Sequence, residues 1–148
     1  MTPPVESDST RAECIIAFDY GTRFIGVAVG QSITRTASPL AALPAKDGTP
    51  NWDQIGALLK EWQPQRLVVG LPLNMDGTPS DMSQRAEKFA KRLHGRYGLP
   101  VEMSDERLSS FEARGEMLAR DRGNRDFRSR GVDSESARLI LEGWFERK

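Results

Sequence analysis

The chain has 148 residues, a length typical of one domain with a substantial hydrophobic core. Its 21 lysines and arginines balance 21 aspartates and glutamates, so the net charge gives no general argument for nucleic-acid binding and none against a local basic patch. The single cysteine, Cys14, excludes an intramolecular disulfide and a cysteine zinc site, and no apolar run approaches the roughly 18 residues that span a bilayer.

The first 13 residues are mostly polar, include two prolines and lack the apolar segment of a signal peptide. They predict a flexible N-terminal tail at 1–13, followed by a single domain at 14–148. A lone cysteine without a disulfide partner is typical of a reducing compartment. We therefore expect a cytoplasmic protein with no membrane partner.

The first part of the domain predicts three strands joined by short connections. Residues 14–18 and 24–29 are short apolar runs with β-branched side chains, and Gly21 allows the turn that makes them a hairpin. Residues 35–43 can form the third strand. Pro39 predicts an edge position or a bulge there, because proline has no N–H to donate to a sheet ladder.

Helices and strands alternate along the rest of the chain. A turn at 46–50 comes first, followed by a helix that Asn51 caps and Pro64 ends, and by a strand at 66–71. A polar loop at 72–80 leads to a helix from Met82 that Gly95 and Gly98 close, and then to a strand at 101–104. The S-x-x-E capping pattern at Ser109 predicts a further helix, which a loop at 120–131 separates from a last helix that begins at Asp133.

This order predicts an α/β fold. We expect a five-stranded mixed sheet, with three antiparallel strands followed by two parallel ones, flanked by helices. Such an order is compatible with an RNase H-like fold, although spacing alone does not distinguish it from other mixed sheets.

Asp19 follows the first apolar strand without a break. A charged side chain at the end of a buried strand costs free energy unless a partner compensates it. One interpretation is a turn residue of the Asx type before Gly21. The other is a ligand for a cation.

Acidic residues mark two further places, Asp105-Glu106 after the fifth strand and Asp133 at the start of the last helix. Each has a structural interpretation as surface charge or as a helix cap. Asp133, however, lies four residues before Ala137, which lies four before Leu141, so it belongs to the apolar stripe that faces the sheet.

Strand alternation bears on the choice between Asp105 and Glu106. Two sets of residues point to opposite faces: Val101, Met103 and Asp105 on one, and Glu102, Ser104 and Glu106 on the other. A regular strand places Asp105 under the core helices. A bulge would reverse the assignment, so both acids remain candidates.

Carboxylates that gather at one site repel one another, so they are expected to have raised pKa values or to bind metal. Oxygen ligands without histidine or cysteine suit Mg²⁺ or Mn²⁺, and two such ions can activate water and stabilise the leaving oxygen in phosphodiester cleavage. The candidate ligands are Asp19, Asp105, Glu106 and Asp133.

Four segments resemble, in order, the motifs of one family. They are "FDYGTRFIGVAVG", "VVGLPLNMDGT", "DERLSSFEAR" and "VDSESARLILEGWF", and the resemblance runs from about residue 14 to 146. The chain is similar to the YqgF family, also called RuvX, small RNase H-like proteins described as pre-16S rRNA nucleases or Holliday junction resolvases.

The resemblance implies an RNase H-like fold and metal-dependent hydrolysis of phosphodiester bonds. It implies catalytic acids at Asp19, in Asp105-Glu106 and at Asp133. The leading interpretation is a nuclease in 5′-end processing of pre-16S rRNA, acting on structured RNA. The same chemistry on four-way DNA junctions is the alternative, and because a resolvase is expected to be a symmetric dimer, monomer and homodimer both stay open.

Two other functional classes are compatible with parts of the sequence. A non-catalytic nucleic-acid-binding factor could keep the same fold without using its acids. The segment "DYGT" resembles the first phosphate loop of the actin and sugar-kinase superfamily, but those proteins need two related domains, and this chain supplies one.

Several residues are candidates for substrate binding. Asn74 lies in the loop after the fourth predicted strand, where ligands often bind in α/β sheets, although an ordinary Asp-Gly turn at Asp76-Gly77 is the alternative. Arg23 and Arg107 adjoin the acids and are expected to hold phosphates or to pair with those acids.

The segment from 120 to 130 has five arginines against two aspartates. This excess predicts phosphate contacts from Arg122, Arg125 and Arg128 in a flexible arm, with a solvated loop as the alternative.

Overall fold

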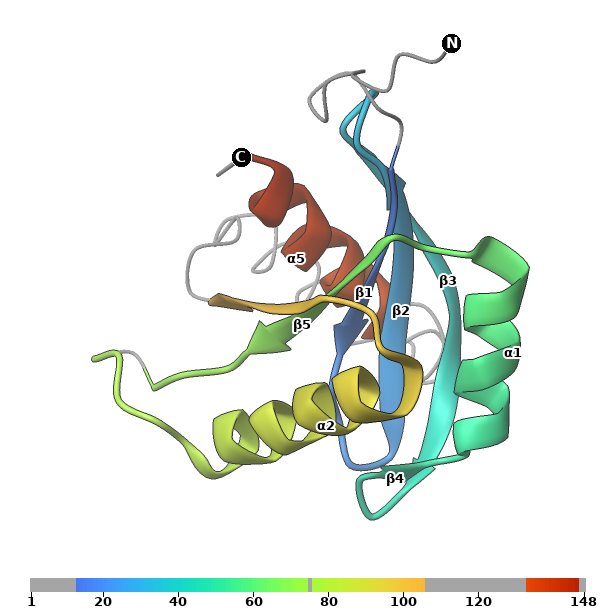
Figure 1. Ribbon diagram of the computed structural model, residues 1–148. Helices are drawn as coiled ribbons and strands as arrows, with labels where there is room; N and C mark the ends of the chain where they lie inside the picture. The colour runs from blue at the N-terminus through green and yellow to red at the C-terminus, as the bar shows by residue number, and fades with distance from the viewer. Residues whose placement is uncertain (1–12, 75, 106–132, 147–148) are drawn as a thin grey trace, which may run out of the picture.

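A computed structural model of the chain describes residues 13–74, 76–105 and 133–146. Its centre is a six-stranded sheet in the order β4-β3-β2-β1-β5-β6, with helices on both faces (Figure 1). The strands are β1 Cys14–Asp19, β2 Phe24–Gln31, β3 Thr36–Lys46, β4 Thr49–Pro50, β5 Arg66–Leu71 and β6 Val101–Asp105. The helices are α1 Trp52–Trp62, α2 Asp81–Tyr97 and α5 Asp133–Glu146.

The predicted α/β fold and its mixed sheet are confirmed. Strands β1, β2 and β3 pair antiparallel, whereas β1, β5 and β6 run parallel. Pro39 pairs regularly with Ala28, and β4 pairs only with Ala45 and Lys46 of β3, so Pro39 has the edge position that was the first of its two expected alternatives. A separate register shift lies between Ile25 and Val27 of β2. The helix expected from Ser109 and the loop at 120–131 lie outside the described residues, as does nearly all of the predicted tail.

The sheet has a sixth strand that the sequence analysis assigned to a turn. Asp47 and Gly48 both have positive φ angles, of 52° and 85°, and form a tight two-residue turn. Such a turn brings its flanking residues together, so Lys46 pairs with Thr49 and Ala45 with Pro50. The expected count of five strands was therefore too low by the short strand β4.

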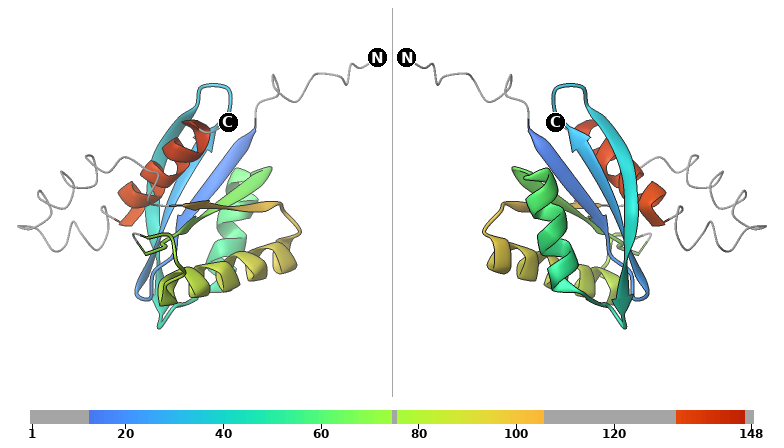
Figure 2. Two further views of the ribbon diagram at one scale, coloured as in Figure 1. Left: turned by 90° about the vertical axis from the view of Figure 1, so that its left-hand side faces the viewer. Right: turned by 90° about the vertical axis from the view of Figure 1, so that its right-hand side faces the viewer.

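The two faces of the sheet carry separate cores, and Figure 2 shows α1 and α2 on one side and α5 on the other. The core under α1 and α2 includes Ile16, Phe18, Ile25, Val27, Leu67, Val69, Leu59 and Phe89. The core under α5 includes Ile15, Ala17, Ala28, Val68, Ile140, Leu141 and Trp144. Alternate residues of β1, β2 and β5 thus belong to opposite faces.

Small residues on β2 let α5 approach the sheet closely. Ala28 belongs to the core under α5, and alternation assigns Gly26 and Gly30 to the same face. A Cβ at Gly30 would lie 2.8 Å from Leu141 Cδ2 and 2.7 Å from the carbonyl oxygen of Thr36. A side chain at Gly30 would therefore push α5 away from the sheet.

The predicted helix boundaries before β5 and β6 are confirmed. Asn51 Oδ1 accepts hydrogen bonds from the amides of Asp53 and Gln54, which caps α1, and Pro64 follows the C-cap. Gly98 ends α2 in the left-handed conformation, whereas Gly95, which was also expected to close this helix, lies inside it. No helix in the described part of the chain is long and apolar enough to cross a membrane.

Candidate active site at the carboxyl ends of β1 and β6

Asp19 is the last residue of β1 and is partly buried. It pairs with Gly26 on β2. On the other side, Phe18 is level with Val69 of β5, so the next residue of β5, Gly70, lies beside Asp19. Because both neighbours are glycines, neither neighbouring strand contributes a side chain at this level.

Alternation along β1 assigns Asp19 to the face that α5 covers. Ile15 and Ala17 belong to the core under α5, and Asp19 continues that series. Tyr20, the next residue, packs against the core on the opposite face. The carboxylate of Asp19 and the ring of Tyr20 therefore point to opposite sides of the sheet end.

Asp105 ends β6 on the opposite face from Asp19. Val101 and Met103 pack against the core under α1 and α2, and Asp105 continues their series, as alternation predicts. Glu102 belongs to the face of α5, because the indole Nε1 of Trp144 donates to its Oε1 over 3.0 Å. Even-numbered positions of β6 thus share a face with Asp19.

The first turn of α5 lies beside Asp19. The buried Ser134 Oγ accepts a hydrogen bond of 3.4 Å from the backbone amide of Val27. Val27 follows Gly26, the cross-strand partner of Asp19. Because Asp133 is the first residue of α5, the fold brings this position to the same end of the sheet as Asp19.

The donor set at this end fits a hard divalent cation rather than zinc. Asp19 and the buried Ser104 belong to the same face and offer oxygen atoms, which suit Mg²⁺ and Mn²⁺, while Asp105 belongs to the other face. Cys14 lies at the other end of β1, and His94 lies in the last turn of α2. In the described residues no three acidic, histidine or cysteine side chains form a cluster, but Glu106 and the side chain of Asp133 are outside that set.

The loop after β5 is held by its own hydrogen bonds. Asn74 Nδ2 donates to Thr78 Oγ1 over 2.9 Å and to the carbonyl of Pro79 over 3.3 Å. Asp76 Oδ1 accepts from both the amide and the hydroxyl of Thr78. Asn74 is exposed and orders this loop, which follows the carboxyl end of β5.

The predicted arginines have different positions. Arg23 is exposed in the turn between β1 and β2, and its carbonyl accepts from the amide of Ala45. Four other candidate arginines lie outside the described residues, as does Glu106; they are Arg107, Arg122, Arg125 and Arg128.

Ser134 was not predicted as a functional residue. A serine one residue into a helix carries no sequence signal for a contact with a distant strand.

Comparisons with known proteins identify one family. A family model described as "RuvX: Holliday junction resolvase" matches residues 13–147. The chain is 60% identical over 131 residues to an Azotobacter vinelandii protein named "Putative pre-16S rRNA nuclease", covering 88% of this chain and 91% of that protein. A Photobacterium profundum protein of the same name is 55% identical over 140 residues, covering 94% and 98%.

Solved structures share the architecture at low sequence identity. RuvC of T. thermophilus in complex with a Holliday junction substrate has a TM-score of 0.51 and 12% identity, covering 91% of this chain and 94% of that chain. The fowlpox virus Holliday junction resolvase has a TM-score of 0.51 and 15% identity, covering 91% and 99%. At such identities the likeness shows the fold alone, and it supports the RNase H-like assignment.

Proposed function

The chain belongs to the RuvX family, and from this membership and the acids at one end of its sheet we propose that it is a metal-dependent nuclease that processes the 5′ end of pre-16S rRNA. The reaction is hydrolysis of phosphodiester bonds. The observation that carries the proposal is the position of Asp19 between two glycine-bearing strands, beside the first turn of α5.

In this proposal, acidic side chains hold the metal. Asp19 and Asp133 are ligands from the end of β1 and the start of α5, together with an acid from the end of β6. When bound, Mg²⁺ or Mn²⁺ supplies polarisation of the scissile phosphate and activation of the attacking water. We propose two ions, as such hydrolysis commonly uses.

The protein's own contribution is to fix these acids before substrate arrives. Asp19 is held by β1, whose neighbours on both sides are buried strands. The start of α5 is held by the hydrogen bond between Ser134 and Val27 and by the buried Ala137. Acids fixed in this way need little reorganisation when charge develops on the phosphate.

The third ligand position has two candidates, Asp105 and Glu106. Alternation along β6 gives even-numbered positions the face of Asp19, and odd-numbered positions the face of α1 and α2. This alternation supports Glu106 as the ligand and a supporting role for Asp105 at the end of the strand.

Substrate contacts are assigned to polar and basic side chains near the acids. We assign phosphate contacts to Arg23, Arg107, Arg122, Arg125 and Arg128, since guanidinium groups bind phosphates with paired donors. Asn74 orders the loop beside the end of β5 and contributes to the substrate surface. The processing of rRNA also supports a cytoplasmic location.

Resolution of four-way DNA junctions is the second candidate function. It is supported by the description of the matching family and by the likeness to RuvC. A junction resolvase is expected to be a homodimer whose two-fold axis matches that of the junction, whereas processing of one RNA end requires only a monomer.

A direct comparison of substrates tests the proposal. Purified protein is incubated with precursor 16S rRNA and, separately, with a four-way DNA junction, each with Mg²⁺, with Mn²⁺ and with EDTA. We expect metal-dependent cleavage of the RNA near the mature 5′ end. Symmetric cleavage of the junction alone would instead assign the protein as a resolvase, and no cleavage of either would contradict nuclease activity.

A further inference from the structure

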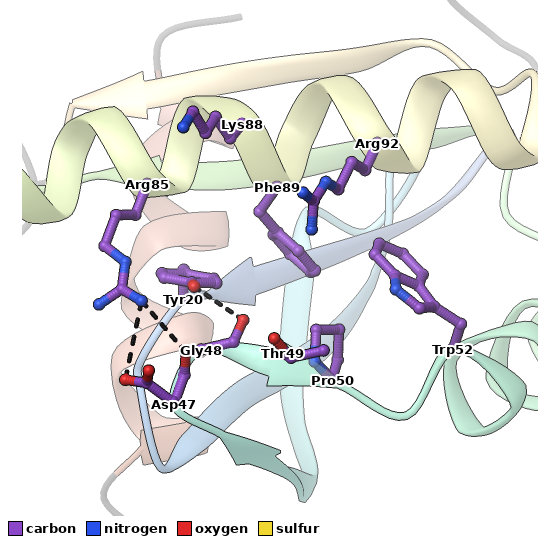
Figure 3. A pocket seen from close by; sticks show the side chains of 10 residues that line it. All are labelled: Tyr20, Asp47, Gly48, Thr49, Pro50, Trp52, Arg85, Lys88, Phe89 and Arg92. Atoms are coloured by element: carbon purple, nitrogen blue, oxygen red, sulfur yellow. Dashed lines mark hydrogen bonds and ion pairs between the residues drawn. The ribbon is translucent and has the colours of Figure 1, made fainter.

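A basic cavity of about 230 Å³ lies between α2, the start of α1 and the turn that joins β3 to β4. Figure 3 shows its lining side chains, with Arg85, Lys88 and Arg92 projecting from α2. We propose that this cavity binds a backbone phosphate of the nucleic-acid substrate, apart from the acidic site. The inference rests on the proposed nuclease function and adds a second contact to it.

The three cations come from one face of α2. Arg85, Lys88 and Arg92 follow at spacings of three and four residues, which places them on one side of a helix. The cavity contains one acid, Asp47, so its lining residues have an excess of two positive charges. A concave site with such an excess attracts polyanions.

Arg85 holds the wall of the cavity, whereas Lys88 and Arg92 remain available to bind a ligand. Arg85 Nη2 donates to the carbonyl of Asp47 over 3.1 Å and lies 3.9 Å from its Oδ1. Among the residues that the structure describes, no carboxylate forms a salt bridge with Lys88 or Arg92, and both are exposed. Their charges can therefore be neutralised by a phosphate without breaking an ion pair.

The wall opposite α2 is fixed by a close contact between Tyr20 and Gly48. The hydroxyl of Tyr20 donates to the carbonyl of Gly48 over 2.7 Å, as Figure 3 shows. Gly48 has a φ of 85°, and a Cβ there would collide with that hydroxyl. The turn at Asp47 is thus held in one geometry, as a preformed binding site requires.

The aromatic side chains of the cavity pack against one another, Trp52 stacked on Phe89 and Tyr20 tilted against it, which favours a phosphate over a base as the ligand. The ring of Phe89 lies 5.3 Å from Tyr20 and 6.0 Å from Trp52, between ring centroids. The guanidinium of Arg96 lies 4.3 Å from the centroid of Trp52. Because these rings already contact one another or Arg96, the cations are the groups that we expect to contact the ligand, and binding should not depend on base sequence.

Two consecutive residues, Asp19 and Tyr20, connect the proposed active site to the cavity. Tyr20 lines the cavity and directly follows Asp19, and the two side chains belong to opposite faces of the sheet. A substrate cut at Asp19 would reach the cavity by crossing the end of the sheet. Folded RNA and branched DNA both have segments that diverge from one point, and either can contact both faces.

A charge-matched pair of variants tests the proposal. Lys88→Gln/Arg92→Gln removes two charges from the cavity, while Lys60→Gln/Lys91→Gln removes two exposed charges that do not line it. Binding of labelled precursor rRNA is measured by anisotropy across a salt series. We expect the cavity variant to flatten the log–log salt slope by about 1.4 to 1.8 and to weaken binding on the order of tenfold at about 0.1 M salt, equally for different base sequences.

Several results would overturn the proposal. Equal slopes for the two double variants would mean that the cavity does not contact the backbone, and a loss that depends on base sequence would replace phosphate with base recognition. A thermal shift with inorganic phosphate that is lost in the cavity variant, together with equal salt slopes for nucleic acid, would assign the cavity to a free anion instead.

Phosphate ethylation interference locates the contact. We expect at least one ethylated phosphate that weakens binding to the parent protein but not to the cavity variant. Cleavage by the parent, measured beside an Asp19→Asn variant, separates the two claims. If cleavage depends on Asp19 while the salt slopes are equal, only the cavity assignment fails; if cleavage does not depend on Asp19, the proposed active site fails.

Discussion

Ser134 and Val27, 107 positions apart in sequence, are joined by a buried hydrogen bond from the Val27 amide to Ser134 Oγ over 3.4 Å. The bond lies where the pairing of β2 with β3 changes register, between Ile25 and Val27. A register shift disrupts the local ladder, and the serine hydroxyl supplies an acceptor there. It also holds the first turn of α5 next to the strand pair that contains Asp19.

Replacement of Ser134 by alanine is expected to destabilise the protein and to slow cleavage. A buried N–H left without its acceptor costs about 1 to 3 kcal/mol, and the start of α5 would lose its anchor beside Asp19. Urea unfolding followed by circular dichroism measures the change. Ser136→Ala, in the same turn but partly exposed, is the control, and equal unfolding free energies for the two variants would contradict this role for Ser134.

The acids at the end of β6 are expected to differ in importance. Glu106→Gln should lower kcat by more than about 100-fold, the scale at which removal of a single charge-stabilising group acts. Asp105→Asn should have a smaller effect, since β6 directs Asp105 to the face of α1 and α2. Single-turnover cleavage by both variants decides, and the reverse ranking would show that the strand alternation ends before residue 106.

Divalent cations are expected to stabilise the folded protein. Only the folded state gathers the acids, and a ligand at about 100 times its Kd adds about 2.7 kcal/mol of stability, which raises Tm by several degrees. The measurement is a thermal melt with EDTA, with Mg²⁺ and with Mn²⁺. Asp19→Asn should reduce the shift, and no shift in either the free protein or its complex with an oligonucleotide would contradict the metal site.

The arginines at 122, 125 and 128 are expected to contact phosphates. Replacing Arg122, Arg125 and Arg128 with serine should weaken binding similarly for all sequences and flatten the salt dependence by about 0.7 to 0.9 per lost contact. A salt titration against the parent protein measures this. An unchanged slope would assign these arginines to a solvated loop, and a changed sequence preference would indicate base contacts instead.

Much of the fold was predictable because its signals are local. Apolar runs predicted the strands before and after α1, and Asn51, Pro64 and Gly98 predicted helix ends through capping and backbone preferences. Strand β4 was missed because its two residues carry no periodicity. Its pairing comes from the positive φ angles of Asp47 and Gly48.

The place of Asp19 at the end of a buried strand was predictable, but the arrangement of the candidate site on the two faces of the sheet was not. The end of a buried strand was enough to select Asp19, but whether Asp19 and Asp105 share a face depends on which helices cover each side of the sheet. The basic spacing of Arg85, Lys88 and Arg92 is visible in the sequence. The cavity itself was not predictable, because the turn at Gly48 that forms its opposite wall comes from a distant segment of the chain.

The central claim, that Asp19 is a catalytic metal ligand rather than a turn residue, is tested most directly by cleavage of precursor 16S rRNA by Asp19→Asn in saturating Mg²⁺ or Mn²⁺. Asparagine keeps the shape and turn preference of aspartate and removes its charge. We predict that, in EDTA, the free energy of unfolding of the variant lies within about 1 kcal/mol of that of the parent protein, and that the variant has no measurable cleavage with metal present. Cleavage by the variant at the parental rate would contradict the claim.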